Sequence, residues 1–234
     1  MSTLYSPSII TDGLVLYLDA ANKKSYSGSG TTWYDRSGSG YNGTLANGAA
    51  FNSTVQSINV DGTDDCIDLG SDITFKTTGG WTVDSWVKYD NVAGSYNNTT
   101  SPANFIGSEG ISYNSWYWSV LNYKLALWNM SPGVWKYGST TIQADTWYNA
   151  VLVCQDSGTS YQMYLNGVAE GGNHTTYEWN ASYSGLKVRW FGRGRISIPR
   201  QVDGVLATKR IYDKALTADE VAQNYNATKS RFGL

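Results

Sequence analysis

The stretch "RIYDKALTADEVAQNY", residues 210–225, is almost the only part of this 234-residue chain with the periodicity of a helix. Thr217 can accept a hydrogen bond as N-cap, and Glu220 can return one to the Thr217 N–H, which is the capping-box pattern. Leu216 and Val221 have the spacing of a hydrophobic staple across the same helix start. We therefore predict one short helix that begins at or next to Thr217.

The rest of the chain alternates apolar and polar residues between Gly, Asn, Asp and Ser clusters, as antiparallel strands do. In "WTVDSWVKY", residues 81–89, Val83 and Val87 fall on one face and Trp86 on the other. Further strands are predicted within residues 13–20, 115–130, 146–168, 186–193 and 202–213. Many short strands closed by one helix indicate an all-β, two-sheet antiparallel sandwich or jelly roll.

Two regions are predicted from their turn residues rather than from alternation. Residues 57–70 predict a hairpin that turns about Asp61-Gly62. Residues 22–56 and 90–104 are rich in Gly, Ser, Asn and Thr, so we expect them to be loops that contact partners.

Composition excludes several classes of protein. Hydrophobic residues make up 41% of the chain, enough for a large core, and 10 Trp and 18 Tyr suit sheet faces and interfaces. The net charge of −2 argues against nucleic-acid binding. One basic cluster is interpreted as a solvated face rather than a polyanion site: Arg189, Arg193, Arg195 and Arg200. No stretch has the length of a membrane span, and the N-terminus lacks a signal-peptide pattern.

Cys66 and Cys154 each lie in an apolar, strand-like run. A core of this size does not need a covalent link, so two buried thiols are favoured and a single disulfide is the alternative. The only histidine is His174, and no Cys/His spacing typical of a metal site is present.

Six segments occur in the order found in one known superfamily: "NGTL" after Trp33, "VDGTDDCIDLG", "WTVDSWVKY", "DTWYNAVLV…YLNG", "FGR" and "VDGV…RIYDKALTADEV". Together they make the chain, from about residue 13 to residue 225, resemble the concanavalin A-like superfamily, in its laminin-G-like, pentraxin-related branch, and we predict that residues 13–234 form one such domain. The resemblance implies a jelly roll with a short helix after the last core strand. That helix is expected to cover the rim of the sandwich through Leu216, Val221 and Tyr225.

The sequence departs from this family where a metal would be expected. Many relatives carry an acidic residue soon after the Gly that opens the last strand, but "GVLATKRIY" has only apolar residues there. An acidic run offers oxygen ligands elsewhere, at Asp61, Asp64, Asp65 and Asp68. Acidic residues are also ordinary turn formers, so we predict no bound metal and keep calcium at these aspartates as the alternative.

The family fold also occurs in glycoside hydrolases, which need two carboxylates across a cleft. The chain has four glutamates: Glu109, Glu170, Glu178 and Glu220. None belongs to the E-x-D-x-x-E strand pattern of those enzymes, and one histidine leaves no plausible Ser/His/Asp set. We predict that the protein is not an enzyme.

Aromatic residues are the remaining candidates for a binding site. Sugar C–H faces stack on exposed rings, so we assign a candidate carbohydrate surface to Tyr113, Trp116, Trp118, Trp128 and Trp135. The favoured alternative for Trp116 and Trp118 is that they fill the sandwich, because buried aromatic ladders are common in such folds.

The start "GLVLYLDAANKKSYSGSGTTWYDRSGSGYNGTL" combined with the "RIYDKALTADEV" ending is similar to laminin-G-like virion proteins of tailed bacteriophages. This resemblance implies a protein made in the host cytoplasm and placed on the virion surface, as a capsid decoration protein or as a fibre or tail protein. Expected partners are other virion proteins, host surface glycans and further copies of the chain. A free carbohydrate-binding lectin is the alternative.

Residues 1–12 are predicted to be a docking arm for a neighbouring subunit, with Leu4, Tyr5, Ile9 and Ile10 as apolar contacts. The alternative is that Ile9 and Ile10 begin the first strand and pack on their own sheet.

Overall fold

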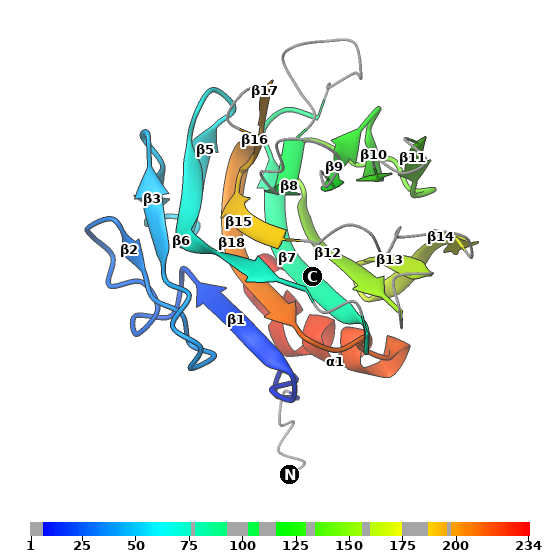
Figure 1. The fold of residues 1–234 in the computed structure, drawn as a ribbon. Helices are drawn as coiled ribbons and strands as arrows, with labels where there is room; N and C mark the ends of the chain where they lie inside the picture. Colours follow the sequence, from blue (N-terminus) through cyan, green and yellow to red (C-terminus); the bar gives the residue numbers. More distant parts are fainter. Residues whose placement is uncertain are drawn as a thin grey trace.

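The computed structural model describes residues 7–75, 78–92, 103–107, 116–129, 134–155, 160–174, 187–195 and 198–234. These residues form two large antiparallel sheets packed face to face, with a helix against the outer face of one sheet (Figure 1). The predicted antiparallel β-sandwich with one short C-terminal helix is confirmed. Within the described residues, no helix is long and apolar enough to cross a membrane.

The sheet that carries the helix is called sheet A. Its strands in spatial order are β14 (Val168–His174), β13 (Tyr161–Leu165), β12 (Trp147–Cys154), β7 (Trp81–Tyr89), β18 (Asp203–Tyr212), β5 (Ser57–Asp61) and β4 (Ala50–Asn52). The first strand, β1 (Leu14–Asp19), also pairs with β18. The N-terminal and C-terminal strands of the domain are therefore hydrogen-bonded neighbours.

The opposite sheet is called sheet B. Its strands in spatial order are β11 (Val134–Tyr137), β10 (Lys124–Asn129), β9 (Trp116–Leu121), β8 (Ala103–Gly107), β15 (Lys187–Phe191), β6 (Cys66–Thr74), β3 (Gly43–Ala46) and β2 (Thr32–Trp33). A short ribbon of β16 (Arg193–Arg195) and β17 (Ile198–Gln201) follows β15 and leads the chain back to sheet A.

The alternation in β7 separates the main core from a second apolar layer, as predicted. Val83 and Val87 lie in the main core between the two sheets. Trp86 is fully buried on the other face of sheet A, where it stacks on Tyr225 and Phe232 from the C-terminal segment. Sheet A is therefore buried on both faces.

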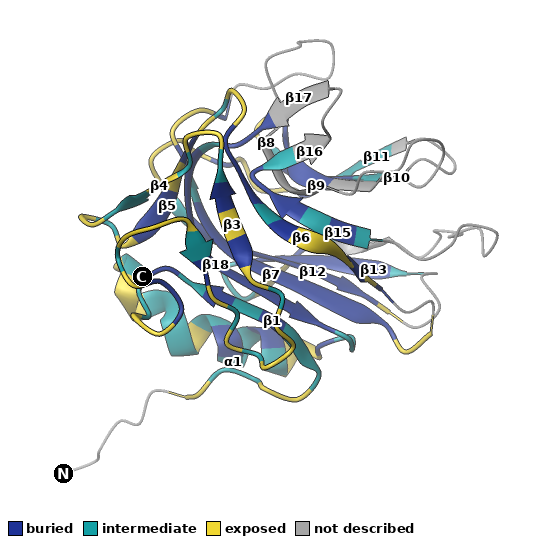
Figure 2. Cartoon of the chain, turned by 60° about the vertical axis from the view of Figure 1, so that its left-hand side comes forward, coloured by how far each residue is buried: buried dark blue, intermediate teal, exposed yellow. Residues whose placement is uncertain are grey.

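Helix α1 (Ala218–Thr228) begins with the predicted capping box: Thr217 and Glu220 exchange hydrogen bonds. Leu216 and Val221 lie together in the second apolar cluster, on the outer face of sheet A. The expectation that the helix covers the rim of the sandwich is wrong. Figures 1 and 2 show it under the face of sheet A, and a short 3₁₀ turn, η2 (Lys229–Phe232), continues the chain beside it.

A buried polar network helps to hold α1 in this position. Asp84 and Arg210 form an ion pair of 3.0 Å with both side chains fully buried. Asn149 donates to Asp84 Oδ1 over 2.7 Å, and Asn224 of α1 donates to Asp84 Oδ2 and to the Tyr212 hydroxyl. Buried charges are costly unless they are paired and hydrogen-bonded, so this network favours one docking position of the helix over others.

The predicted hairpin of residues 57–70 is wrong. β5 pairs with β18 and β4 in sheet A, whereas β6 pairs with β3 and β15 in sheet B. The turn at residues 62–65 therefore carries the chain from one sheet to the other. Alternation in the two strands is the same for a hairpin and for a sheet-to-sheet crossing, so the pattern alone could not separate them.

The expected loop of residues 22–56 contains the short strands β2, β3 and β4. Much of its order comes from Asp35, whose carboxylate accepts backbone hydrogen bonds from Tyr17 at 2.9 Å and from Gly40 at 2.9 Å. A single carboxylate thus ties a Gly/Ser-rich segment to β1. Most of the other expected loop, residues 90–104, lies outside the described residues.

Three further predictions are confirmed. β9 and β10 pair across a tight turn at Asn122 and Tyr123, and both turn residues have positive φ. β12 pairs with β13, and Asn166-Gly167 opens the next turn. Cys66 and Cys154 are buried thiols in different sheets and form no disulfide.

Candidate functional site

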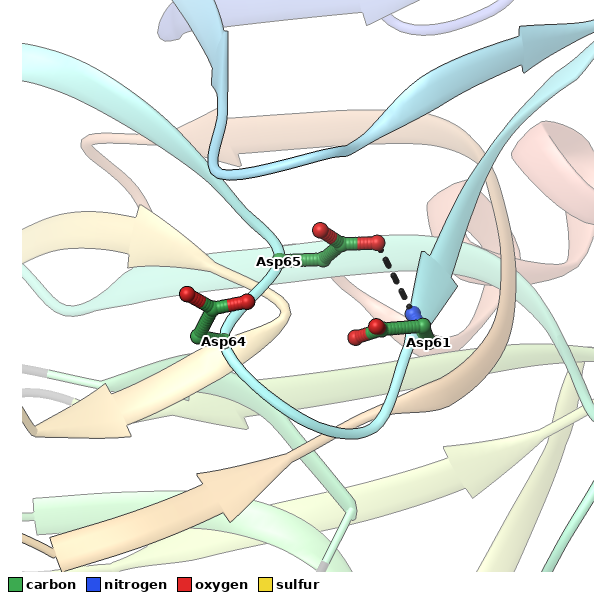
Figure 3. A group of neighbouring side chains, drawn as sticks. All are labelled: Asp61, Asp64 and Asp65. Carbon is green, nitrogen blue, oxygen red and sulfur yellow. Dashed lines mark hydrogen bonds between the residues drawn. The ribbon is translucent and has the colours of Figure 1, made fainter.

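One candidate site is an acidic corner, which we define as Asp61, Asp64 and Asp65. It lies where the chain leaves β5 in sheet A and enters β6 in sheet B. One carboxylate oxygen from each residue lies within 4.8 Å of the other two. Figure 3 shows the carboxylates of Asp61 and Asp64 turned toward one another, with that of Asp65 beside them.

Backbone hydrogen bonds shape the corner. Asp65 Oδ2 accepts the Asp61 N–H at 3.0 Å, and Asp61 Oδ1 accepts the Thr63 N–H at 2.8 Å. The pattern explains why Asp residues occur in this turn: a short acidic side chain can replace a backbone acceptor. It also brings three carboxylates together at a cost in charge repulsion.

The raised pKa values of two aspartates reflect this charge repulsion. Asp65 is only 5% exposed, and burial raises its pKa, with further contributions from the charges of Asp61 and Asp64. The pKa of the neighbouring Asp203 is also raised, first by burial and then by Asp90 and Asp61. The corner is therefore an uncompensated centre of negative charge.

Asp68, the fourth aspartate of the predicted calcium set, lies outside the acidic corner. It forms an ion pair with Arg189 at 3.0 Å. Burial acts to raise the Asp68 pKa, but the hydrogen bond from Arg189 and the Gly70 N–H outweigh it, so the pKa is lowered. Arg189, one member of the basic cluster, thus has a partner within its own chain.

A second candidate is the aromatic surface, defined as Trp128 on β10 with Trp135 and Tyr137 on β11. All three side chains are partly exposed. The Trp128 and Trp135 ring centroids lie 5.3 Å apart, and those of Trp135 and Tyr137 lie 6.5 Å apart. Sequence reasoning missed Tyr137, although its spacing of two from Trp135 places both on one face of a strand.

The other predicted sugar-binding residues differ in their positions. Trp118 is fully buried in the main core, so its ring is not available at the surface, in agreement with the alternative that it fills the sandwich. Tyr113 and the side chain of Trp116, whose backbone begins β9, lie outside the described residues.

The predicted docking arm is partly tied to its own domain. The Ile10 N–H donates to Asn224 Oδ1 at 2.8 Å, its carbonyl accepts from the Tyr212 hydroxyl at 3.1 Å, and its side chain packs on the second apolar cluster. The Ser8 carbonyl accepts from Gln223. Ile9 is partly exposed beside these contacts, and both residues precede β1. Leu4 and Tyr5 lie outside the described residues.

This topology and these two surfaces can be compared with known proteins. A family model described as the concanavalin A-like lectin/glucanases superfamily matches residues 61–222, which is more than half of the chain. The chain belongs to this superfamily. Among curated proteins, none matches the chain in sequence.

Solved structures share the fold at low identity. Trypanosoma rangeli sialidase aligns with a TM-score of 0.66 and 14% identity over 94% of this chain and 33% of that chain. Domain 4 of AbnA, a GH43 extracellular arabinanase from Geobacillus stearothermophilus solved in complex with arabinotriose, aligns with a TM-score of 0.64 and 18% identity. That match covers 91% of this chain and 98% of the domain. The chain thus spans about a third of the sialidase but nearly all of the arabinanase domain.

Proposed function

We propose that this protein is a non-catalytic carbohydrate-binding domain whose sugar-contacting side chains are Trp128, Trp135 and Tyr137. The observation that carries the proposal is the aromatic surface itself. Partly exposed rings on adjacent strands offer flat apolar faces, which suit the C–H faces of a sugar. The arabinotriose complex of the similar arabinanase domain makes arabino-oligosaccharides the first ligands to test.

The carboxylates support a non-catalytic role. Glu170 is buried, and its Oε1 accepts hydrogen bonds from the Ser139 N–H at 2.5 Å and the Thr140 N–H at 2.7 Å. Glu220 is occupied by the capping box and by Lys214. Both glutamates of the described residues therefore have structural partners and do not form an acid/base pair across a cleft. Glu109 and Glu178 lie outside the described residues.

Titration with glycans tests this proposal. Wild-type protein is screened on a glycan array that includes arabino-oligosaccharides, and hits are measured by isothermal titration calorimetry. W128A and W135A are expected to weaken binding about fivefold each, since one aromatic contact contributes about 1 kcal/mol. Y34A is the matched control, because Tyr34 is 48% exposed and distant in sheet order from β11. Absence of any glycan ligand, or equal loss in Y34A, would refute the proposal.

We further propose that the domain is part of a bacteriophage virion, located either on the capsid or on a tail or fibre. The sequence resemblance to laminin-G-like virion proteins supports this setting. The hydrogen bonds that Ser8 and Ile10 make with α1 also support the virion setting. They hold residues 8–10 against the domain, so the residues before them would start from a fixed position and could reach other virion proteins. In this setting the domain would bind the particle without catalysis and adsorb to host glycans.

Mass spectrometry of purified virions tests the virion setting separately from sugar binding. Peptides of this chain should be present at a stoichiometry comparable with that of known structural proteins. A free lectin predicts no such peptides, together with glycosidase or secretion genes beside the coding sequence instead of capsid and tail genes.

A further inference from the structure

Two of the three rings of the aromatic surface lie on a short edge strand. β11 is the last strand of sheet B and pairs with β10 alone, over the four residues Val134–Tyr137. Trp128, by contrast, lies on β10, which has a paired strand on each side. Edge segments with few contacts open at a low cost in free energy. The positions of Trp135 and Tyr137 therefore depend on what else holds β11.

A carboxylate from the other sheet contacts the chain just after β11. Glu170 lies on β14, the last strand of sheet A, and Figure 1 shows β11 and β14 at the same end of the sandwich. Its Oε1 accepts hydrogen bonds from the Ser139 N–H at 2.5 Å, from the Ser139 hydroxyl and from the Thr140 N–H at 2.7 Å. The approach is close, because a Cβ at Gly138 would lie 2.8 Å from Glu170 Cγ. Glu170 thus joins the edges of the two sheets.

The charge of Glu170 makes this contact strong. The side chain is only 4% exposed, and no ion pair among the described residues involves it. Burial acts to raise its pKa, but the hydrogen bonds from Ser139 and Thr140 outweigh burial and lower this pKa, so the carboxylate is ionised at neutral pH. Hydrogen bonds to an ionised acceptor are about twice as strong as those between neutral groups. If β11 moved away from sheet A, a buried charge would lose its donors, and this cost opposes the movement.

We propose that Glu170 is a positioning residue for sugar binding, because it holds β11 where Trp135 and Tyr137 can contact the ligand. This inference rests on the proposed sugar-binding function. Glu170 does not touch the sugar itself and acts through the two rings. Only molecules with β11 in place present the complete aromatic surface, so the apparent affinity falls in proportion to the population that loses this position. Trp128 stays in place without Glu170, since β10 is paired on both sides.

Calorimetric titration with arabinotriose, or with the strongest hit of the glycan array, tests the role of Glu170. E170A should weaken binding about tenfold, between the losses of about fivefold for one ring and about 25-fold for two. Combined with W128A, E170A should again cost about tenfold, but combined with W135A only about twofold, because one of the two positioned rings is then already missing. E170Q keeps the acceptor oxygen without the charge and should restore binding to about threefold below the wild type. T217A, destabilised at the distant helix α1, is the matched control and should bind as the wild type does.

A second measurement needs no ligand. The Trp128 and Trp135 ring centroids lie 5.3 Å apart, close enough for exciton coupling in far-ultraviolet circular dichroism. The couplet is assigned by its loss in W128F. E170A should reduce this couplet at temperatures where the protein is folded, whereas T217A should leave it unchanged. If E170A does not fold, S139A replaces it, because Ser139 is exposed and its hydroxyl is one of the three donors.

The two measurements separate the failure of this inference from the failure of the sugar-binding proposal. A couplet of wild-type size in folded E170A, or in S139A where it replaces E170A, overturns the role of Glu170 whether or not a glycan binds. Wild-type affinity in folded E170A, or equal losses in the W128A and W135A backgrounds, overturns it as well. A reduced couplet in E170A together with no glycan ligand for the wild type refutes the sugar-binding function, and Glu170 then holds β11 without a role in binding.

Discussion

Lys209 is a lysine in the middle of the sandwich, and replacing it with methionine should stabilise the protein at neutral pH. The residue is fully buried in β18, in register with Ser85 on β7 and Leu18 on β1. Its Nζ lies 5.5 Å from the centroid of the Phe191 ring on the opposite sheet. Burial lowers the pKa of Lys209 from 10.5 to about 7, and the attraction of Asp84 opposes that change.

The magnitude follows from the difference between the folded and unfolded chains. The unfolded chain keeps a lysine pKa near 10.5, so between pH 7 and pH 10.5 it binds a proton that the folded chain does not. Stability therefore rises with pH through this window, and below pH 7 the full penalty of about 5 kcal/mol is present. K209M removes that penalty and also loses a cation–π contact of about 1–2 kcal/mol. The expected net gain at pH 7 is about 3 kcal/mol.

The assay is urea unfolding of the wild type and K209M at several pH values from 7 to 10. The advantage of K209M should fall by about 2 kcal/mol over this range, to about 1 kcal/mol at pH 10, because the folded wild type is then neutral and has lost both most of the penalty and the cation–π contact. The wild type and K209M share all other titrating groups, so the difference between their unfolding free energies depends on Lys209 alone. K24M is the control, because Lys24 is exposed and should show no such trend. An advantage that does not change with pH would refute the reasoning.

Three further substitutions test the other buried or capping groups. D84A leaves Arg210 buried without its partner and should cost about 3–5 kcal/mol in urea unfolding at pH 7. Burial acts to raise the pKa of Glu170, but the hydrogen bonds from Ser139 and Thr140 outweigh burial and lower this pKa. E170Q should therefore destabilise the protein at neutral pH. In acid denaturation, the difference in stability between E170Q and the wild type should shrink as the pH falls through the folded-state pKa of Glu170. T217A removes the N-cap of α1 and should lower stability by about 1 kcal/mol in thermal unfolding, with unchanged glycan binding.

Short-range signals predicted the local elements well. The Thr217 cap, the alternation in β7 and the Asn166-Gly167 turn are each specified by residues within one or two turns of chain, and the structure contains all three. Gly43 of the "NGTL" segment has a packing reason to be glycine: a Cβ there would lie 2.5 Å from the Ile67 side chain of the neighbouring strand. Only glycine fits at position 43 without moving the Ile67 side chain.

Contacts between distant segments could not be predicted from the same signals. The crossing of β5 to β6 between sheets looks like a hairpin in sequence, because both connect two alternating runs through a Gly/Asp turn. The position of α1 depends on Asn224 meeting Asp84, 140 residues away in the chain. These are tertiary pairings, which leave no periodic trace in sequence.

The two proposed contact regions lie apart on the domain, and this separation gives the last prediction. The first described residues are held against α1 under sheet A, whereas β10 and β11 form the far end of sheet B (Figures 1 and 2). Two regions on separate elements with no shared residue should act independently. Deleting residues 2–8 should therefore abolish binding to virions or self-association and leave glycan affinity unchanged, since the contacts of Ile10 are retained.

W135A should give the reverse pattern, with weakened glycan binding and normal incorporation into particles. Both variants should melt within a few degrees of the wild type, because Pro7 and Ser8 are exposed and Trp135 is only partly buried. If the deletion unfolds the domain, residues 2–8 belong to the core, as the alternative for the arm requires. If the deletion weakens glycan binding as much as W135A does, the two regions are coupled and their independence is refuted.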